Sequence, residues 1–400
     1  MRRRRFNPAL PLLLLAVASP GLALAAEGKG DFILDARLRY EFVDQDGFAN
    51  QADALTLRTR LGYETPAVSG FKALIEAENV TALVDRYNST TNGEVTYPVV
   101  LDPEATEINR AQISWTGSRA EAVVGRQRLI LNNARFVGTA GFRQNEQTFD
   151  AAKVVFKPTA TVSFTLAYID RVRRILGDDS PQGEWDSDSY LMQFDAKAGS
   201  SQISAYGYLL DFENAPTQSS ATWGARLAGS HPLSNGLTAT YEVEYARQSE
   251  YGGNPADFDL DYLALAGGLK KDARAIAIGL ERLDGNGSRG FGTPLASLHP
   301  FQGWADVFGV TPAAGVRDFN LRASTTVKPG LLPKPLKVQV ALHDFADADG
   351  SLDYGQEFDL LFSTPLTPHV NAELKAAVFD GDLPAFADRT KVWMTIEVKF

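Results

Sequence analysis

The chain has 400 residues, no cysteine and a formal net charge of −10 at pH 7. The absence of cysteine excludes a fold held together by disulfides. The acidic balance argues against a nucleic-acid partner, because binding DNA or RNA requires a basic footprint.

The first 26 residues have the three parts of an export signal. Arginines at positions 2–5 form a positive segment, Leu12–Leu15 open a short apolar run, and the sequence around Ala23 and Ala25 suits cleavage. The apolar run is too short for a membrane anchor. We assign residues 1–26 to a signal peptide and residues 27–400 to the mature domain. Without those four arginines, 35 basic residues face 49 acidic ones, so the mature chain carries about −14.

The mature chain has the pattern of a transmembrane β-barrel. After residue 26, no apolar run approaches the roughly 18 to 20 residues of a membrane helix. The only other membrane architecture is the closed barrel. From Phe32 on, apolar side chains such as Leu38 alternate with polar ones such as Arg37 and Arg39, which gives a strand one apolar and one polar face.

This pattern predicts about 18 antiparallel strands of about ten residues, the length of a tilted membrane strand. In chain order the segments are 32–43, 55–63, 71–78, 110–115, 119–125, 149–157, 161–170, 190–197, 203–211, 221–230, 237–247, 260–269, 273–283, 317–328, 336–343, 356–363, 370–379 and 391–400. We therefore predict an all-β fold with a single closed barrel.

The connections between these segments alternate between short turns and long loops. Turns such as 157–161 and 198–201 are rich in Gly, Pro, Ser, Thr and Lys. Loops such as 127–147 and 284–316 are much longer. Porin-like barrels have short periplasmic turns and long extracellular loops, so we expect both termini in the periplasm of a Gram-negative cell.

The last strand, Lys391–Phe400, ends the chain on an exposed apolar aromatic residue. Lipid solvates such a face, and the strand looks like the assembly signal of outer-membrane proteins. We expect contacts with outer-membrane lipid, lipopolysaccharide and the barrel-assembly machinery. Pairing with segment 32–43 would place Lys391 and Lys399 on the inward side. Trp393 shares that side, and the sequence assigns it no role.

Other motifs favour structural explanations. Gly285, Gly287 and Gly290 match the dinucleotide spacing, but no helix pattern follows them. The acidic segment 344–350 fails the register of an EF-hand, although an acidic loop could bind divalent cations loosely. The four histidines are scattered singly. We expect no cofactor, no metal site and no catalysis; a barrel enzyme acting on lipid or peptide is the remaining alternative of another class.

Arginines carry the sharper functional signal. Arg37, Arg39, Arg58 and Arg60 lie on the polar faces of the first two segments, and Arg110 and Arg322 share this parity. A cation facing the lipid midplane would cost about 2–4 kcal/mol, so these side chains should point inward. They either pair with carboxylates such as Glu41, Glu64, Glu76 and Glu78, or form a ladder that passes anions.

The stretch 125–150 breaks the alternation. Strict parity would turn Arg126 and Arg128 outward, and a bulge or fold-in at Gly125 would bring them inward. We expect this loop to narrow the lumen, with Arg143 among the arginines that attract and relay anions. Asn145 and Asp150 would fix the constriction.

Three motifs of this stretch resemble a known family. They are Gly-Arg-Gln-Arg from Gly125, Arg-Phe-Val-Gly from Arg135, and Gly-Phe-Arg-Gln-Asn-Glu-Gln-Thr-Phe-Asp from Gly141. They look like the signature of the alginate-export family of outer-membrane barrels, and the segment from His299 resembles a second family region. The resemblance implies a monomeric 18-stranded barrel with an arginine-rich lumen that passes polyuronate. This chain has shorter loops and a more acidic charge than that archetype.

The sequence thus predicts a passive outer-membrane channel. Its cargo would be an alginate-like anionic polysaccharide or small carboxylated solutes. The alternative is a general or sugar-uptake porin without anion preference. The candidate lumen and substrate-binding residues are Arg37, Arg39, Arg58, Arg60, Arg110, Arg126, Arg128, Arg143, Asn145, Asp150 and Arg322.

Overall fold

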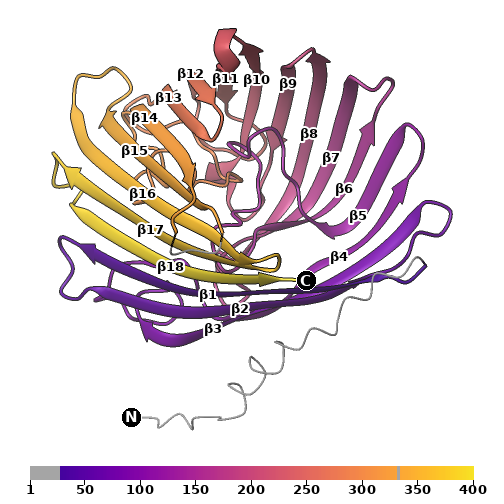
Figure 1. Cartoon of the computed structure of the whole chain (residues 1–400), viewed down its shortest axis with the longest axis horizontal. Coiled ribbons are helices and arrows are strands. Elements are labelled where there is room, and N and C mark those ends of the chain that lie inside the picture. Colours follow the sequence, from indigo (N-terminus) through magenta and orange to yellow (C-terminus); the bar gives the residue numbers. More distant parts are fainter. Residues whose placement is uncertain (1–27, 331–333) are drawn as a thin grey trace.

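The computed structural model describes residues 28–330 and 334–400, and the predicted signal peptide, 1–26, lies outside the described residues. This part of the chain forms one closed sheet of 18 antiparallel strands, which confirms the predicted barrel (Figure 1). Two short 3-10 helices, η1 (Pro216–Gln218) and η2 (Ser234–Gly236), interrupt the connections. No helix among the described residues is long and apolar enough to cross a membrane.

Every predicted segment overlaps one observed strand. The strands are β1 (Asp31–Gln45), β2 (Ala52–Glu64), β3 (Phe71–Arg86), β4 (Ala105–Thr116), β5 (Ala120–Gln127), β6 (Thr148–Phe156), β7 (Val162–Arg173), β8 (Glu184–Ala198), β9 (Ser201–Leu210), β10 (Ser220–Pro232), β11 (Thr238–Ser249), β12 (Asp259–Lys271), β13 (Arg274–Leu283), β14 (Val316–Val327), β15 (Leu336–Ala346), β16 (Asp353–Thr367), β17 (Val370–Gly381) and β18 (Arg389–Lys399).

The barrel closes where its first and last strands meet. Each strand pairs with its neighbour in sequence, and β1 pairs with both β2 and β18. At this seam Arg39 lies opposite Thr395 and Leu38 opposite Ile396. The chain end is also paired, because the Phe400 amide donates to the Leu34 carbonyl oxygen at 2.8 Å. Closure leaves no free sheet edge, which removes the site where another chain could add a strand.

The two faces of the barrel wall differ sharply in polarity. Outward side chains at the seam are apolar and solvent-accessible, such as Met394 at 55% and Ile396 at 46% exposure. Inward side chains are charged and buried, such as Arg39, Glu41 and Lys391. Alternation along each strand produces this contrast. The apolar surface of the wall therefore faces outward, and the buried residues lie inside the ring of strands.

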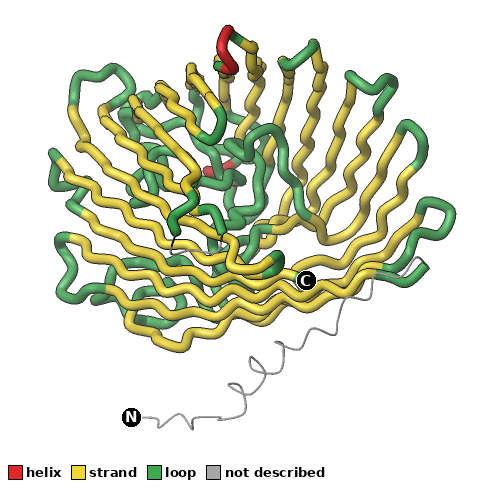
Figure 2. The backbone as a smooth tube through the Cα atoms, in the orientation of Figure 1, coloured by secondary structure: helices red, strands yellow, loops and turns green. Residues whose placement is uncertain are grey.

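Two of the long connections fold back into the barrel. Figure 2 shows loop segments, drawn in green, within the ring of strands. The first inward loop (128–147) joins β5 to β6, and the second inward loop (284–315) joins β13 to β14. The short turns gather at the opposite end of the strands from the long loops, and these ends are called the short-turn end and the long-loop end below.

The seam register can be tested by a disulfide, because the native chain has no cysteine. Leu38→Cys combined with Ile396→Cys should form a disulfide in mild oxidant, since paired residues on neighbouring strands lie within bonding range. The cross-linked chain should migrate faster than the reduced chain on a denaturing gel. Leu38→Cys combined with Leu374→Cys is the control, because β17 is not a neighbour of β1. Cross-linking of the control pair alone would contradict the register.

Candidate functional site

The two inward loops fill part of the lumen with a packed core. Leu129 and Phe136 of the first loop, and Leu295 and Phe308 of the second, are almost fully buried. They belong to one apolar cluster with inward residues of the wall. Phe136, for example, packs edge-on against Tyr262 of β12, with ring centroids 5.1 Å apart. The interior of the barrel is therefore narrowed by ordered protein.

The two loops are bonded to each other. Val137 and Leu295 form a parallel β-bridge, and the Gly138 amide donates to the Leu295 carbonyl oxygen at 2.8 Å. The Ala140 amide donates to Ser297 Oγ at 3.0 Å, and Gln147 Nε2 donates to the Leu295 carbonyl at 3.0 Å. Backbone groups inside a protein need such partners. The loops therefore form a single insert.

Arginines of β1 and β2 hold the first loop against the wall. Arg37 Nη1 donates to the carbonyl oxygens of Gly141 and Phe142 at 3.0 and 3.1 Å. The Arg39 guanidinium lies 4.3 Å from the centre of the Phe142 ring, a cation–π contact. These donors satisfy carbonyls that the loop itself leaves free.

Seven inward arginines are matched in number by seven carboxylates, and some of the arginines contact more than one carboxylate. The pairs are Arg37–Glu397, Arg39–Asp102, Arg58–Asp35, Arg60–Glu78, Arg110–Glu76, Arg128–Glu146 and Arg143–Glu41. Arg58 is fully buried between Asp35 and Glu397. Glu64, which the sequence offers as another partner, pairs with Lys72 instead. The formal charges of these fourteen residues therefore sum to zero.

A bulge lets two residues of β4 reach the same carboxylate. Pairing between β3 and β4 skips Asn109, so Asn109 and Arg110 both oppose Glu76. Asn109 Nδ2 donates to Glu76 at 2.8 Å and to Glu146 of the first loop at 2.9 Å. The wall and the loop thus share donors at this point.

Arg126 and Asp150 do not lie where the sequence analysis expects them. The chain passes Gly125 without a register shift, although Gly125 has a φ of 113°. Arg126 keeps the parity of the outward Val124, and Asp150 is on the opposite face from the buried Phe149. The two side chains form an ion pair at 2.8 Å on this outward face. The predicted fold-in at Gly125 is therefore wrong.

The other candidate residues lie inside the barrel. Arg128 points inward because β5 ends at Gln127, and it is 32% exposed. Asn145 donates to the carbonyl oxygens of Pro103 and Ile175 at 3.0 and 3.2 Å, which ties the first loop to two further loops. Arg322 lies on the inner face of β14, and it forms no ion pair with the residues that the structure describes.

Asp306 joins the second loop to the first loop and to the seam. Its carboxylate accepts from Arg143 at 2.8 Å and from Lys391 at 3.1 Å. Burial favours the neutral acid, but His299 and these cations hold the pKa of Asp306 well below its usual range. A charged carboxylate therefore sits where the two loops and β18 meet.

His299 sits beside Asp306 as a neutral imidazole. Lys375 can only donate, so His299 Nε2 accepts from it at 2.8 Å and Nδ1 donates to Asp306 at 2.8 Å. The ring also stacks on Phe142 of the first loop. Burial lowers the pKa of His299 to about 3 despite the opposing effect of Asp306.

Trp393, the residue to which the sequence assigned no role, supports both loops. It is 1% exposed, and its ring meets Phe142 edge-on at 5.8 Å and His299 at 5.5 Å. Lys391 Nζ lies 5.2 Å from the same ring. In the sequence, a tryptophan on the polar face of a strand is the feature that could have predicted this role. It indicates the place on the wall where the inward loops pack.

The sequence analysis did not identify two carboxylates of the wall that bind the inward loops. Glu357 of β16 accepts from the Ala305 amide at 2.7 Å, and Glu281 of β13 pairs with Arg135 of the first loop at 2.6 Å. Gly303 has a φ of 77°, and a Cβ there would lie 2.4 Å from the Glu357 carboxylate. Only glycine lets the loop approach so closely.

The glycine-rich segment from Gly285 and the acidic segment 344–350 have structural roles. Gly285 and Gly290 form an isolated bridge within the second loop. Asp347 accepts from the amides of Ser351 and Leu352, so its carboxylate is used within a turn. Across residues 28–330 and 334–400, no group of three or more metal-ligating side chains is placed to hold a metal ion.

Comparisons with known proteins show the fold. No protein family and no curated sequence matches the chain, so the resemblance to the alginate-export family gains no support there. Acinetobacter baumannii OccAB4 superposes with a TM-score of 0.70 at 12% identity, over 93% of this chain and 98% of that chain. Pseudomonas aeruginosa OpdL gives 0.68 at 17%, over 93% and 98%. OpdK, an outer membrane protein of P. aeruginosa, gives 0.69 at 13%, over 92% and 98%.

Removing the Trp393 ring should release the inward loops. Trp393→Ala is expected to weaken their docking by about 3–5 kcal/mol, because a fully buried aromatic side chain is lost. Hydrogen exchange should rise in 128–147 and 284–315 while the strands remain protected. Trp223→Ala is the control, because that ring is on the outward face. Equal effects of the two substitutions would contradict this role.

Loop docking should weaken in mild acid. Docking lowers the pKa of His299 from about 6.5 to about 3. The neutral ring therefore contributes its full share of the docking free energy above pH 6.5, and this share is lost as the pH falls toward 3. Between pH 7 and pH 5 we expect a loss of about 2 kcal/mol. Exchange of the Ala305 amide, corrected for its intrinsic pH dependence, measures this. His299→Gln keeps both hydrogen bonds without titrating, so an unchanged pH dependence in that variant would refute the assignment.

Proposed function

We propose that the protein is a passive channel of the Gram-negative outer membrane for small hydrophilic solutes, with carboxylated solutes preferred. One observation carries the proposal: a closed 18-stranded barrel is apolar outside and charged inside, and two ordered loops narrow its lumen. A closed barrel satisfies all its backbone hydrogen bonds between strands while it exposes apolar side chains to lipid. That OpdK is an outer membrane protein supports the location.

This location implies specific surroundings. Both termini would lie in the periplasm, since the short turns share their side. The outward face would contact lipid and lipopolysaccharide, and β18 with Phe400 would be read by the barrel-assembly machinery. The closed sheet has no free edge, in keeping with a monomer.

The preference for carboxylates is argued from the cations that solute can reach. Most inward arginines are buried beside carboxylates, so solute cannot reach them. Arg128 is the most exposed of the paired set, and Arg322 has no carboxylate partner in the described structure. A guanidinium of this kind binds a carboxylate in bidentate fashion and releases it readily when acidic groups lie nearby. These two side chains would give shallow successive sites.

A general porin without anion preference is the second candidate. The matching of seven arginines by seven carboxylates favours it, because a group of balanced charges attracts anions weakly. An extended polyuronate is a poorer cargo for this lumen. The linked inward loops occupy space that such a polymer would need.

Ion selectivity in planar bilayers separates these candidates. We expect the wild-type channel to prefer chloride over potassium at low salt, where lumenal charge is least screened. Arg128→Gln with Arg322→Gln should lower the permeability ratio by about twofold or more. Arg247→Gln removes one cation from the outward face and is the matched control.

Each outcome has a clear meaning. A wild-type ratio near unity, unchanged in the double variant, would support the general porin. A cation preference unaffected by either change would overturn the carboxylate proposal. Glucuronate should reduce single-channel chloride current at millimolar concentration, and an alginate oligomer of equal charge concentration should do so less.

A further inference from the structure

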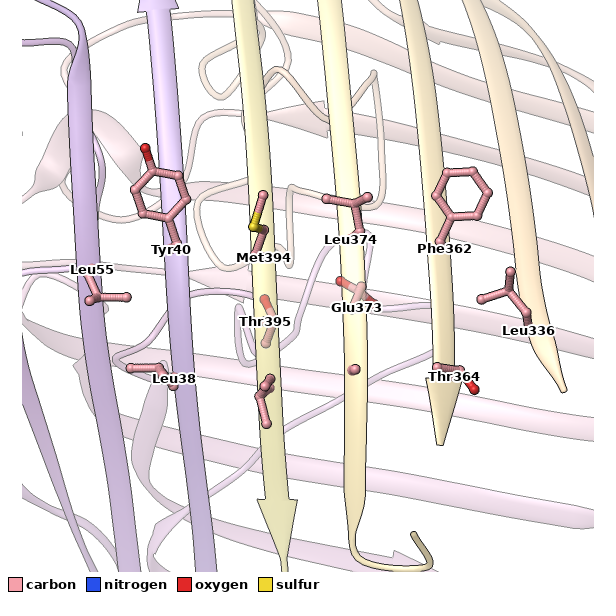
Figure 3. Close-up of a pocket in the computed structure, with 12 residues that line it drawn as sticks. Leu38, Tyr40, Leu55, Leu336, Phe362, Thr364, Glu373, Leu374, Met394 and Thr395 are labelled. Atoms are coloured by element: carbon pink, nitrogen blue, oxygen red, sulfur yellow. The ribbon is translucent and has the colours of Figure 1, made fainter. Parts of the chain in front are cut away.

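An apolar groove crosses the outward face of the barrel at its seam. It has a volume of about 370 Å³ and runs over β15, β16, β17, β18, β1 and β2 (Figure 3). Leu336 lies at one end, and Leu55 and Tyr40 lie at the other. The groove is remote from the inward loops, because its side chains point away from the lumen.

The shape of the groove follows from the strand register. A ridge on the long-loop side consists of four large side chains that are partners across neighbouring strands: Tyr40, Met394, Leu374 and Phe362. The next row toward the short-turn end contains Leu38, Ile396, Ala372 and Thr364. Ala372 has no atom beyond Cβ, so this row is lowest in its middle. One small residue among larger ones thus hollows the surface.

The lining of the groove is hydrocarbon, and the polar atoms of its outward side chains are already hydrogen-bonded. Thr364 Oγ1 donates to the Pro335 carbonyl oxygen at 3.1 Å, and the Tyr40 hydroxyl donates to Asp53 at 2.5 Å. Glu373 and Thr395 border the groove, but their parity turns their side chains inward. An occupant would therefore gain contact area and no hydrogen bond. This chemistry fits an alkyl chain.

The size of the groove also favours an alkyl chain over a protein partner. A stable protein interface buries about 800 Å² on each side, which is a broad patch of 20 to 30 residues. This groove involves a narrow band of side chains between two register rows. A flexible chain can follow such a band, whereas a second barrel would meet the ridge first.

We propose that this groove holds one acyl chain of a membrane lipid in a fixed position at the barrel seam. The inference rests on the proposed location in a lipid bilayer. The bound chain would cover the β1–β18 contact, which joins the two ends of the sheet. It would stay with the protein when loosely associated lipid is washed away.

Native mass spectrometry tests the proposal with the full mature chain. The protein is loaded with dipalmitoyl phosphatidylethanolamine and washed in detergent, and the fraction that retains lipid is measured from its mass. Ala372→Phe should lower the retained lipid about tenfold, the effect of withdrawing roughly two methylene groups from an apolar site. Ala376→Phe is the matched control, because it lies on the same strand and face but outside the lining. Equal retention in both variants, or equal loss, would overturn the proposal.

A second measurement needs no substitution that could disturb assembly. Wild-type protein that is loaded with a lipid carrying a diazirine-labelled acyl chain, washed in detergent and then irradiated should cross-link mainly to β16, β17, β18 and β1. Labelling spread evenly around the barrel would overturn the proposal. So would a stable dimer without retained lipid, since a second copy would then be the occupant.

These results are distinguishable from failure of the proposed function. If the wild-type protein inserts and conducts but shows no preferential labelling, only the lipid site is wrong. If it neither inserts into bilayers nor conducts, the membrane location itself is wrong.

Discussion

Charge pairing inside a closed wall is the constraint on which the rest of this structure depends. Alternation sends every second side chain inward, and in this chain many of those side chains are arginines and carboxylates. A buried charge without a partner is strongly destabilising, whereas a paired and hydrogen-bonded one is tolerated. Arg58 is fully buried and is held by Asp35 and Glu397 from two other strand positions. The pairing therefore allows charged side chains to be buried on the inner face of the wall, and it holds those side chains in position.

The inward loops use this wall in two complementary ways. Arg37 donates to backbone carbonyls of the first loop, and Glu357 accepts from a backbone amide of the second. The same two kinds of contact recur with the loops exchanged, because Arg389 donates to the Ala305 carbonyl oxygen of the second loop and Glu78 accepts from the Glu146 amide of the first. Asp306 then connects the two loops through Arg143. Polar groups of both loops thus find partners on the wall, and an apolar cluster that includes inward wall residues completes the packing of the loops.

The sequence predicts the barrel well because its information is local. Strand alternation, turn chemistry and loop length are each visible in short stretches of sequence, and together they predict all 18 strands. The seam was also predictable, since a closed sheet leaves β18 no other partner than β1. The site was less predictable because its partners are far apart. Arg143 and Asp306 are separated by 163 residues, and no local pattern pairs them.

Arg126 shows that strand parity can place a charged side chain on the outward face. The assumption that an arginine must avoid the outward face led to a predicted bulge at Gly125. That argument holds at the bilayer midplane, but Arg126 lies near the long-loop end of β5, where the cost of an outward charge falls toward zero. Asp150 pairs with it on the same face. Position along the strand, combined with an opposite charge on the neighbouring strand, therefore decides the direction of a charged side chain better than its charge alone.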